Sequence, residues 1–132
     1  MNSSIRVVLV GGGHCNVQVL KQLKRIMPKS GKLTIVTDDP VAFYSEMLPG
    51  AVSNLYSNND LIIHLEPLAI WSHAEYIKNK VIKIIGNENI IELEDGSIVE
   101  YDLLVINIGS RTKGTFDIEG VWDHSITTRP IN

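Results

Sequence analysis

The stretch IRVVLVGGGHCNVQVL, residues 5–20, decides the fold that the sequence predicts. Residues 5–10 form an apolar, β-branched run of the kind found in strands that a parallel sheet buries on both faces. Three glycines come next, followed by a helical pattern in which apolar residues recur at three- and four-residue spacing, at Val17, Leu20, Leu23 and Met27. The stretch therefore predicts a strand, a glycine turn and a helix.

A second strand completes the pattern. Pro28 and Gly31 end the helix, and LTIV at residues 33–36 is again short, apolar and β-branched. A strand, a turn, a helix and a strand within about 32 residues match the length of a βαβ unit, whose two strands are parallel. The sequence thus predicts an α/β fold with a Rossmann-like parallel sheet.

The middle of the chain gives weaker signals. Residues 38–59 are rich in Pro, Ser, Asn and Gly, and we expect a loop there that hides a short helix over 44–48. Residues 60–74 predict another short helix with Pro67 in its first turn, although 61–65 fit an extended segment equally well. A loop of about twenty residues in a compact domain indicates either a function or an unrecognised element.

Strands are predicted again from residue 75 onward. A short strand is expected at 75–78, followed by a small antiparallel β-meander at 80–85, 89–94 and 98–100 with glycine-containing turns between its strands. LLVINI at 103–108 predicts a return to a fully buried strand of the parallel sheet. No periodic segment follows residue 110.

The glycine turn matches most of the dinucleotide-binding fingerprint G-x-G-x-x-G. Gly11 permits the tight turn out of the strand, and Gly13 lets the backbone approach a pyrophosphate, which the first helix amides and the helix dipole attract. Asn16 stands in place of the third glycine, so either the helix lies further from the strand or Asn16 uses its amide locally. The alternative is a glycine turn that only reverses the chain.

Side chains near the turn add candidates. Asp38 follows the second strand, where a carboxylate that holds the adenine ribose is expected; its alternative role is to cap the turn before Pro40. His14 could donate a hydrogen bond to a phosphate or pack on the helix. Cys15 is expected to be a small buried residue, with a reactive thiol as the alternative.

Composition sets broad limits on function. The 132 residues carry a net charge of −3, which argues against nucleic acid as the main partner, since phosphate binding needs a basic surface. No apolar run reaches the length of a transmembrane helix. The single cysteine, Cys15, excludes an internal disulfide, and we expect a cytoplasmic protein.

Three segments carry a family resemblance: GGGHCN at residues 11–16, YSEMLPG at 44–50 and YDLLVINIGS at 101–110. They resemble the FAD-dependent pyridine nucleotide–disulfide oxidoreductases. Within that family they are most similar to the type II NADH dehydrogenase-like branch, including the flavoprotein module fused to selenide, water dikinase. The ending at residues 128–131 is similar to that family's passage toward its NAD-binding domain.

The resemblance implies FAD, rather than NAD, as the ligand of the first glycine loop. The ribose would lie near Thr37 or Asp38, although many relatives have Glu where this chain has Thr37. Asn107 to Ser110 stand where relatives have Ala-Thr-Gly-Ser. The residues expected to contact the pyrophosphate, ribose, adenine or flavin are Gly11, Gly13, His14, Cys15, Asn16, Thr37, Asp38, Tyr44, Ser45, Val81 and Gly109.

The resemblance also implies an activity. Full-length relatives pass a hydride from NAD(P)H through FAD to a small-molecule acceptor such as a quinone. The redox cysteine pair of the disulfide reductases is excluded here, because Cys15 is the only cysteine. Because a second glycine fingerprint and a returning segment are absent, we expect residues 1–132 to be the first part of an FAD-binding domain, inactive alone.

Two alternatives stay open at this point. One is a non-catalytic nucleotide-binding or interaction module, and the other is a dehydrogenase domain whose glycine loop holds NAD. Oligomerisation, and peripheral membrane association of the full-length protein, are also left open by the sequence.

Overall fold

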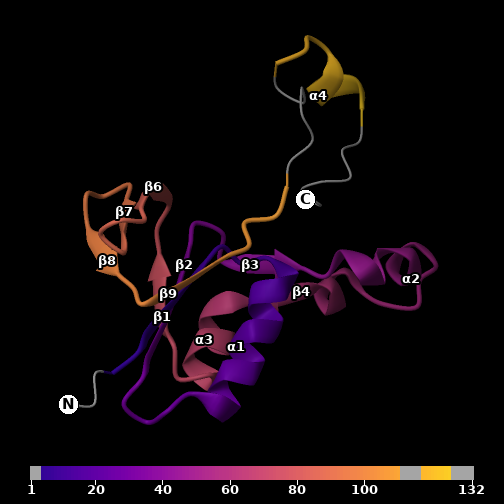
Figure 1. The fold of residues 1–132 in the computed structure, drawn as a ribbon. Coiled ribbons are helices and arrows are strands. Elements are labelled where there is room, and N and C mark those ends of the chain that lie inside the picture. The colour runs from indigo at the N-terminus through magenta and orange to yellow at the C-terminus, as the bar shows by residue number, and fades with distance from the viewer. Residues whose placement is uncertain (1–3, 111–116, 126–132) are drawn as a thin grey trace.

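A four-stranded parallel sheet forms the centre of the protein (Figure 1). The computed structural model describes residues 4–110 and 117–125, so the 128–131 segment lies outside the described residues. The strand order is β5-β2-β1-β9, and all three neighbouring pairs are parallel. The strands are β1 (Arg6–Val10), β2 (Lys32–Thr37), β5 (Glu75–Lys78) and β9 (Leu103–Ile106).

Helices cover one face of this sheet and the antiparallel meander covers the other. Val7 and Leu9 of β1 are buried against Leu20 of α1 (His14–Ile26) and Ala69 of α3 (Leu65–Trp71). Val8 and Val10, which alternate with them along the strand, are buried against Ile91 and Leu93 of the meander instead. The meander consists of β6 (Val81–Ile85), β7 (Ile90–Leu93) and β8 (Ile98–Glu100). Because both faces are covered, the apolar run of β1 needs no polar alternation.

The predicted βαβ unit is confirmed. Helix α1 begins directly after the glycine turn and buries Val17 and Leu20, two of the residues whose spacing predicted it. Lys24 and Arg25 stand in its last turn, where the helix dipole favours positive charge. The meander is also confirmed, with both strand pairs antiparallel.

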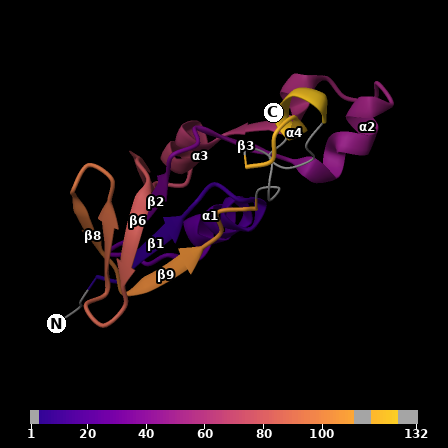
Figure 2. The ribbon, with the colours of Figure 1, turned by 90° about the horizontal axis from the view of Figure 1, so that it is seen from above.

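The loop prediction for residues 38–59 is wrong in detail. This segment and the residues that follow it contain β3 (Val41–Phe43), η1 (Ser45–Met47), α2 (Leu48–Val52), η2 (Asn58–Leu61) and β4 (Ile62–His64). Strands β3 and β4 pair in antiparallel fashion, and the segment between them extends away from the main sheet (Figure 2). Each element is five residues or shorter, too brief to produce a readable period. The short helix expected near residues 44–48 is present, as η1 and α2.

The prediction of a fully buried strand at residues 103–108 is also wrong. Strand β9 is four residues long and pairs, among the described residues, with β1 alone. Leu103 and Ile106 are therefore about half exposed at this edge of the sheet. A last short helix, α4 (Val121–His124), is a single turn. It is too short to produce a periodic pattern of apolar residues in the sequence. Among the described residues, no helix is both long and apolar enough to cross a membrane.

Candidate cofactor site

The glycine loop between β1 and α1 requires glycine at two positions, 11 and 13. Gly11 has a φ of +88°, and a Cβ on it would lie 2.3 Å from the Asn107 carbonyl oxygen. A Cβ on Gly13 would lie 1.3 Å from Asn107 Oδ1 and 2.8 Å from its carbonyl oxygen. The loop therefore packs directly against the chain that leaves β9.

Hydrogen bonds tie this loop to both neighbouring strands. The Gly11 N–H donates to the Val36 carbonyl at 2.8 Å, and the Gly13 N–H donates to the Asn107 carbonyl at 3.0 Å. In return, the Asn107 N–H donates to the Val10 carbonyl at 2.8 Å. Two of the loop amides are thus used inside the protein, and these two cannot serve a ligand.

The start of α1 supplies other amide donors. The first intrahelical bond runs from the Val17 N–H to the Gly13 carbonyl at 3.2 Å, so the N–H groups of His14, Cys15 and Asn16 precede it. The first turn contains no acidic residue that would oppose an anion. Free amides and the positive end of the helix dipole together make this turn suited to a phosphate.

Asn16 uses its amide locally, which is one of the two outcomes expected from the sequence. Its side chain is completely buried. Nδ2 donates to the Val10 carbonyl at 3.0 Å and to the Gly11 carbonyl at 2.9 Å. The helix therefore keeps its close position although the third glycine of the fingerprint is absent.

His14 and Tyr44 form an aromatic pair beside the loop. Their ring centroids lie 4.5 Å apart at an interplanar angle of 55°. Tyr44 follows β3, so this contact brings the segment around YSEMLPG against the start of α1. A hydrogen bond with the Glu46 carboxylate raises the pKa of the Tyr44 hydroxyl above its usual value. Nδ1 of His14 is a buried atom for which the described residues provide no hydrogen-bond partner.

The two candidates for binding the ribose, Thr37 and Asp38, differ in exposure at the carboxyl end of β2. Thr37 is buried, and its hydroxyl lies 3.2 Å from both the carbonyl oxygen and the N–H of Asp39. Asp38 is exposed just beyond the strand. Of the two residues, Asp38 is the one with an accessible polar side chain.

The remaining candidates lie around the loop at different depths. The expectation of a buried Cys15 is wrong, because this side chain is exposed on the outer side of the first turn, next to the buried Asn16. Ser45 is exposed at the start of η1, and Val81 is half-buried at the start of β6. Gly109 has a φ of +71° with no neighbouring atom within 4 Å of a Cβ position, so its backbone conformation alone favours glycine.

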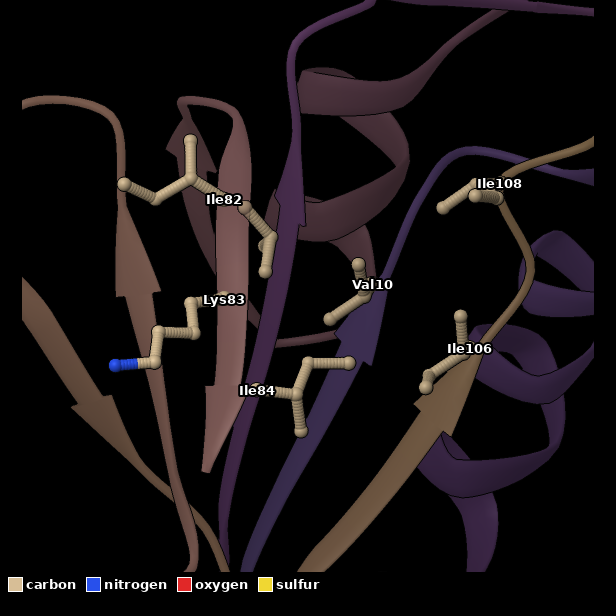
Figure 3. A pocket seen from close by; sticks show the side chains of 7 residues that line it. Val10, Ile82, Lys83, Ile84, Ile106 and Ile108 are labelled. Carbon is tan, nitrogen blue, oxygen red and sulfur yellow. The ribbon is translucent and has the colours of Figure 1, made fainter. Parts of the chain in front are cut away.

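An apolar cleft of about 310 Å³ lies next to the loop (Figure 3). Val10, Ile84 and Ile106 point toward one another across it, whereas the Lys83 ammonium group points away. The cleft is lined by Val10, Val81, Ile82, Lys83, Ile84, Ile106 and Ile108. It lies by the carboxyl ends of β1 and β9, where open α/β sheets bind their ligands.

Sequence reasoning missed the cleft and assigned no role to the Asn107 side chain. The cleft depends on how the meander lies over β1 and β9, which no local pattern specifies. For Asn107 a signal existed, because it is a single polar residue inside the apolar run LLVINI. A polar residue in such a run is a signal because polar groups that a sheet buries usually have a hydrogen-bond partner.

A scan against family models matches residues 5–132 to the family described as pyridine nucleotide-disulphide oxidoreductase. The chain belongs to this family. The match includes the glycine loop, the Tyr44 segment and β9, so the resemblance stated from three short motifs is confirmed over nearly the whole chain.

Two proteins of known name are similar to this chain in sequence. The sulfide-quinone reductase of Aquifex aeolicus is 29% identical over 119 residues, which are 90% of this chain and 27% of that protein. A probable ferredoxin reductase of Castellaniella defragrans is 29% identical over 122 residues, 86% of this chain and 28% of that protein. This family member thus spans about a quarter of the length of its curated relatives.

Two solved structures are similar to this chain in fold. The sulfide:quinone oxidoreductase of Aquifex aeolicus superposes with a TM-score of 0.73 at 28% identity, covering 84% of this chain and 26% of that chain. The NDH2 of Plasmodium falciparum, in complex with NADH, reaches a TM-score of 0.64 at 16% identity, covering 86% of this chain and 24% of that chain. The Rossmann-like fold class is therefore confirmed for this member.

Proposed function

We propose that residues 1–132 are the first part of an FAD-binding domain and that the loop at residues 11–16 binds the FAD diphosphate. The observation that carries this proposal is the first turn of α1, which follows the glycine loop and contains no acidic residue. The amides of His14, Cys15 and Asn16 add the donors that an anion requires. The glycines at 11 and 13 let the loop pack against Asn107, which leaves these amides next to the carboxyl ends of β1 and β9.

The other candidate residues take roles around the same cofactor. Asp38, exposed after β2, would accept hydrogen bonds from the ribose hydroxyls, as carboxylates at that position do. The backbone at Val81 would meet the adenine. Tyr44 and Ser45 would lie toward the flavin ring or the diphosphate, with His14 packed on Tyr44. Thr37 supports the turn at Asp39 rather than the ribose, since its hydroxyl is already engaged there.

The apolar cleft supports a ligand that has planar rings as well as phosphates. Its lining is almost entirely valine and isoleucine, and it adjoins Gly11 through Val10. Pockets for cofactors combine apolar walls with a few placed polar groups, which is the combination that the cleft and the loop amides offer together.

We further propose that the full-length protein passes a hydride from NAD(P)H to an acceptor such as a quinone. FAD, when bound, supplies the hydride and electron chemistry, and this part of the chain binds and orients it. The names of the relatives support a quinone or a ferredoxin as the acceptor, whereas the name sulfide-quinone reductase gives sulfide as the donor of that relative. Within residues 1–132 Cys15 is the single cysteine, so this part of the protein contains no cysteine pair.

Flavin binding tests the proposal directly. The purified chain is refolded with FAD, freed of excess ligand and examined for the visible absorption of oxidised flavin and for quenching of flavin fluorescence. NADH binding is measured in parallel. We expect retained FAD and much weaker NADH binding. A colourless chain that binds NADH but not FAD would overturn the assignment in favour of an NAD-binding dehydrogenase domain.

A further inference from the structure

Asn16 is a polar side chain in a completely buried place. It stands in the first turn of α1, at the fingerprint position where glycine normally allows the helix to approach the strand. A buried amide is costly unless it forms hydrogen bonds. The NH₂ group of this amide has such partners, whereas Oδ1 is buried without a hydrogen-bond partner among the described residues.

The partners of Asn16 are two consecutive carbonyl groups at the end of β1. Nδ2 donates to the Val10 carbonyl at 3.0 Å and to the Gly11 carbonyl at 2.9 Å. Chemistry fixes the orientation of the amide, since Oδ1 in that place would face two acceptors with no proton between them. Both protons of the side-chain NH₂ group are thus spent on the glycine loop.

These bonds set the direction of the next peptide group. The C=O and N–H of a trans peptide point in opposite directions, and the Gly11 carbonyl belongs to the same peptide as the Gly12 N–H. With the Gly11 carbonyl held inward by Asn16, the Gly12 N–H must point away from Asn16. The preceding peptide follows the same geometry: the Val10 carbonyl accepts from Asn16 and Asn107, and the Gly11 N–H donates on the opposite side to Val36.

We infer that Asn16 is a positioning residue for diphosphate binding. Its carboxamide fixes the peptide between Gly11 and Gly12, so that the Gly12 N–H joins the first amides of α1 as a donor to the diphosphate. A clamp from the third fingerprint position thereby replaces the close packing that glycine provides there. This inference rests on the proposed function of the loop as a diphosphate site.

The experiment uses ADP, which carries the diphosphate, and adenosine, which lacks it. In Asn16→Ala we expect the affinity for ADP to fall about tenfold, the effect of losing one well-aligned donor to a charged group, while the affinity for adenosine stays unchanged. Asn16→Gly, which restores the fingerprint, should show the same loss. Gln18→Ala, an exposed amide on the same helix, is the matched control and should bind both ligands like the wild type.

Amide hydrogen exchange of the ligand-free chain gives a second readout. In Asn16→Ala, the Gly11 and Gly13 amides, which are bonded to Val36 and Asn107, should lose protection, while the Ile35 amide in β2 keeps it. A merely structural role would instead lower the protection of Ile35 and the binding of both ligands together. That result would overturn the inference, as would wild-type affinity for ADP in both Asn16 variants.

The two proposals fail in different ways. If the wild-type chain binds neither ADP nor FAD, the proposed function of this chain fails. The exchange experiment then decides the inference on loop geometry alone: selective loss of protection at Gly11 and Gly13 supports the clamp, and unchanged protection overturns it.

Discussion

The Gly13 N–H donates a 3.0 Å hydrogen bond to the Asn107 carbonyl, and the Asn107 side chain lies where a Gly13 Cβ would stand. This contact joins the turn after the first strand to the end of the last strand of the sheet, two segments far apart in the sequence. It also means that the shape of the glycine loop is set by packing against protein, before any ligand arrives.

Replacing Gly13 with alanine should destabilise the protein by about 1–3 kcal/mol, the usual cost of forcing an extra carbon into packed surroundings. The new Cβ would meet Asn107 Oδ1 at 1.3 Å and its carbonyl oxygen at 2.8 Å. Chemical denaturation measures the free energy of unfolding. Gly86→Ala is the control, because no atom lies within 4 Å of its Cβ position. Equal stability of the two variants would contradict the packing seen here.

Removing the Asn107 side chain should rescue Gly13→Ala in part. Asn107→Ala deletes the Oδ1 contact but leaves the backbone carbonyl in place. The double variant should therefore be more stable than the sum of the single effects predicts, by about 0.5–3 kcal/mol, the range for residues in contact. A double-mutant cycle by denaturation measures this coupling, and purely additive effects would show that the side chain is not the obstacle.

The same contact shows how far the sequence could predict this molecule. The strands at Arg6–Val10 and Lys32–Thr37, helix α1 and the meander follow from periods long enough to be read locally. The position of Asn107 against Gly13 depends on β1 and β9 pairing in parallel, a long-range event that no local pattern encodes. The same limit explains the half-exposed Ile106, since an apolar run does not tell whether its strand is central or at an edge.

Apart from the short helix near residues 44–48, the elements between β2 and α3 were beyond prediction for another reason. A three-residue strand such as Val41–Phe43 has no period, and its pairing with Ile62–His64 stabilises both. Yet Tyr44 and His14 were both named as site candidates without any signal that they touch each other. For this site, residue types were predictable and their contacts were not.

The contact between Lys24 and Trp71 should contribute measurably to stability. The Lys24 ammonium lies 3.5 Å from the centroid of the Trp71 ring, on neighbouring helices α1 and α3. A double-mutant cycle with Lys24→Met and Trp71→Leu should give a coupling of about 0.5–1 kcal/mol, as expected for an exposed cation–π pair. Lys21→Met, an exposed lysine on the same helix, serves as the control. A coupling energy indistinguishable from zero would show that this contact does not stabilise the protein.

The ring of Tyr44, rather than its hydroxyl, should hold the Tyr44 segment against α1. Tyr44→Phe keeps the ring that packs on His14 at 4.5 Å and should change the free energy of unfolding little. Tyr44→Leu removes the aromatic pair and should cost about 0.5–1.5 kcal/mol more than the Phe variant. Denaturation of the three proteins tests this, and a larger loss in Tyr44→Phe would assign the contact to the hydroxyl and its bond with Glu46 instead.

Asp102 should make the stability of the protein depend on pH at the acid end. Arg6 Nη2 donates to Oδ1 at 2.9 Å, while Arg6 Nε and its backbone N–H donate to Oδ2 at 3.1 and 2.7 Å. These hydrogen bonds lower the pKa of the Asp102 carboxyl from 3.8 to about 2. The bonds from the guanidinium group have the largest effect, and the bond from the backbone N–H has the next largest. Arg6 also pairs with Glu100, so the start of β1 is tied to the segment that enters β9.

The sign of this effect follows from the lowered pKa. A carboxyl whose pKa is lower in the folded state stabilises the protein above its unfolded pKa, and loses that contribution as pH falls through the folded value. Asp102→Asn should therefore be less stable than the wild type at pH 7, and the difference should shrink between about pH 4 and pH 2. Thermal unfolding across this range measures it. In an Arg6→Gln background, most of the pH-dependent difference in stability between the proteins with and without the Asp102→Asn substitution should vanish. In the wild-type background, a difference that grows as pH falls would show that the Asp102 pKa is not lowered by folding.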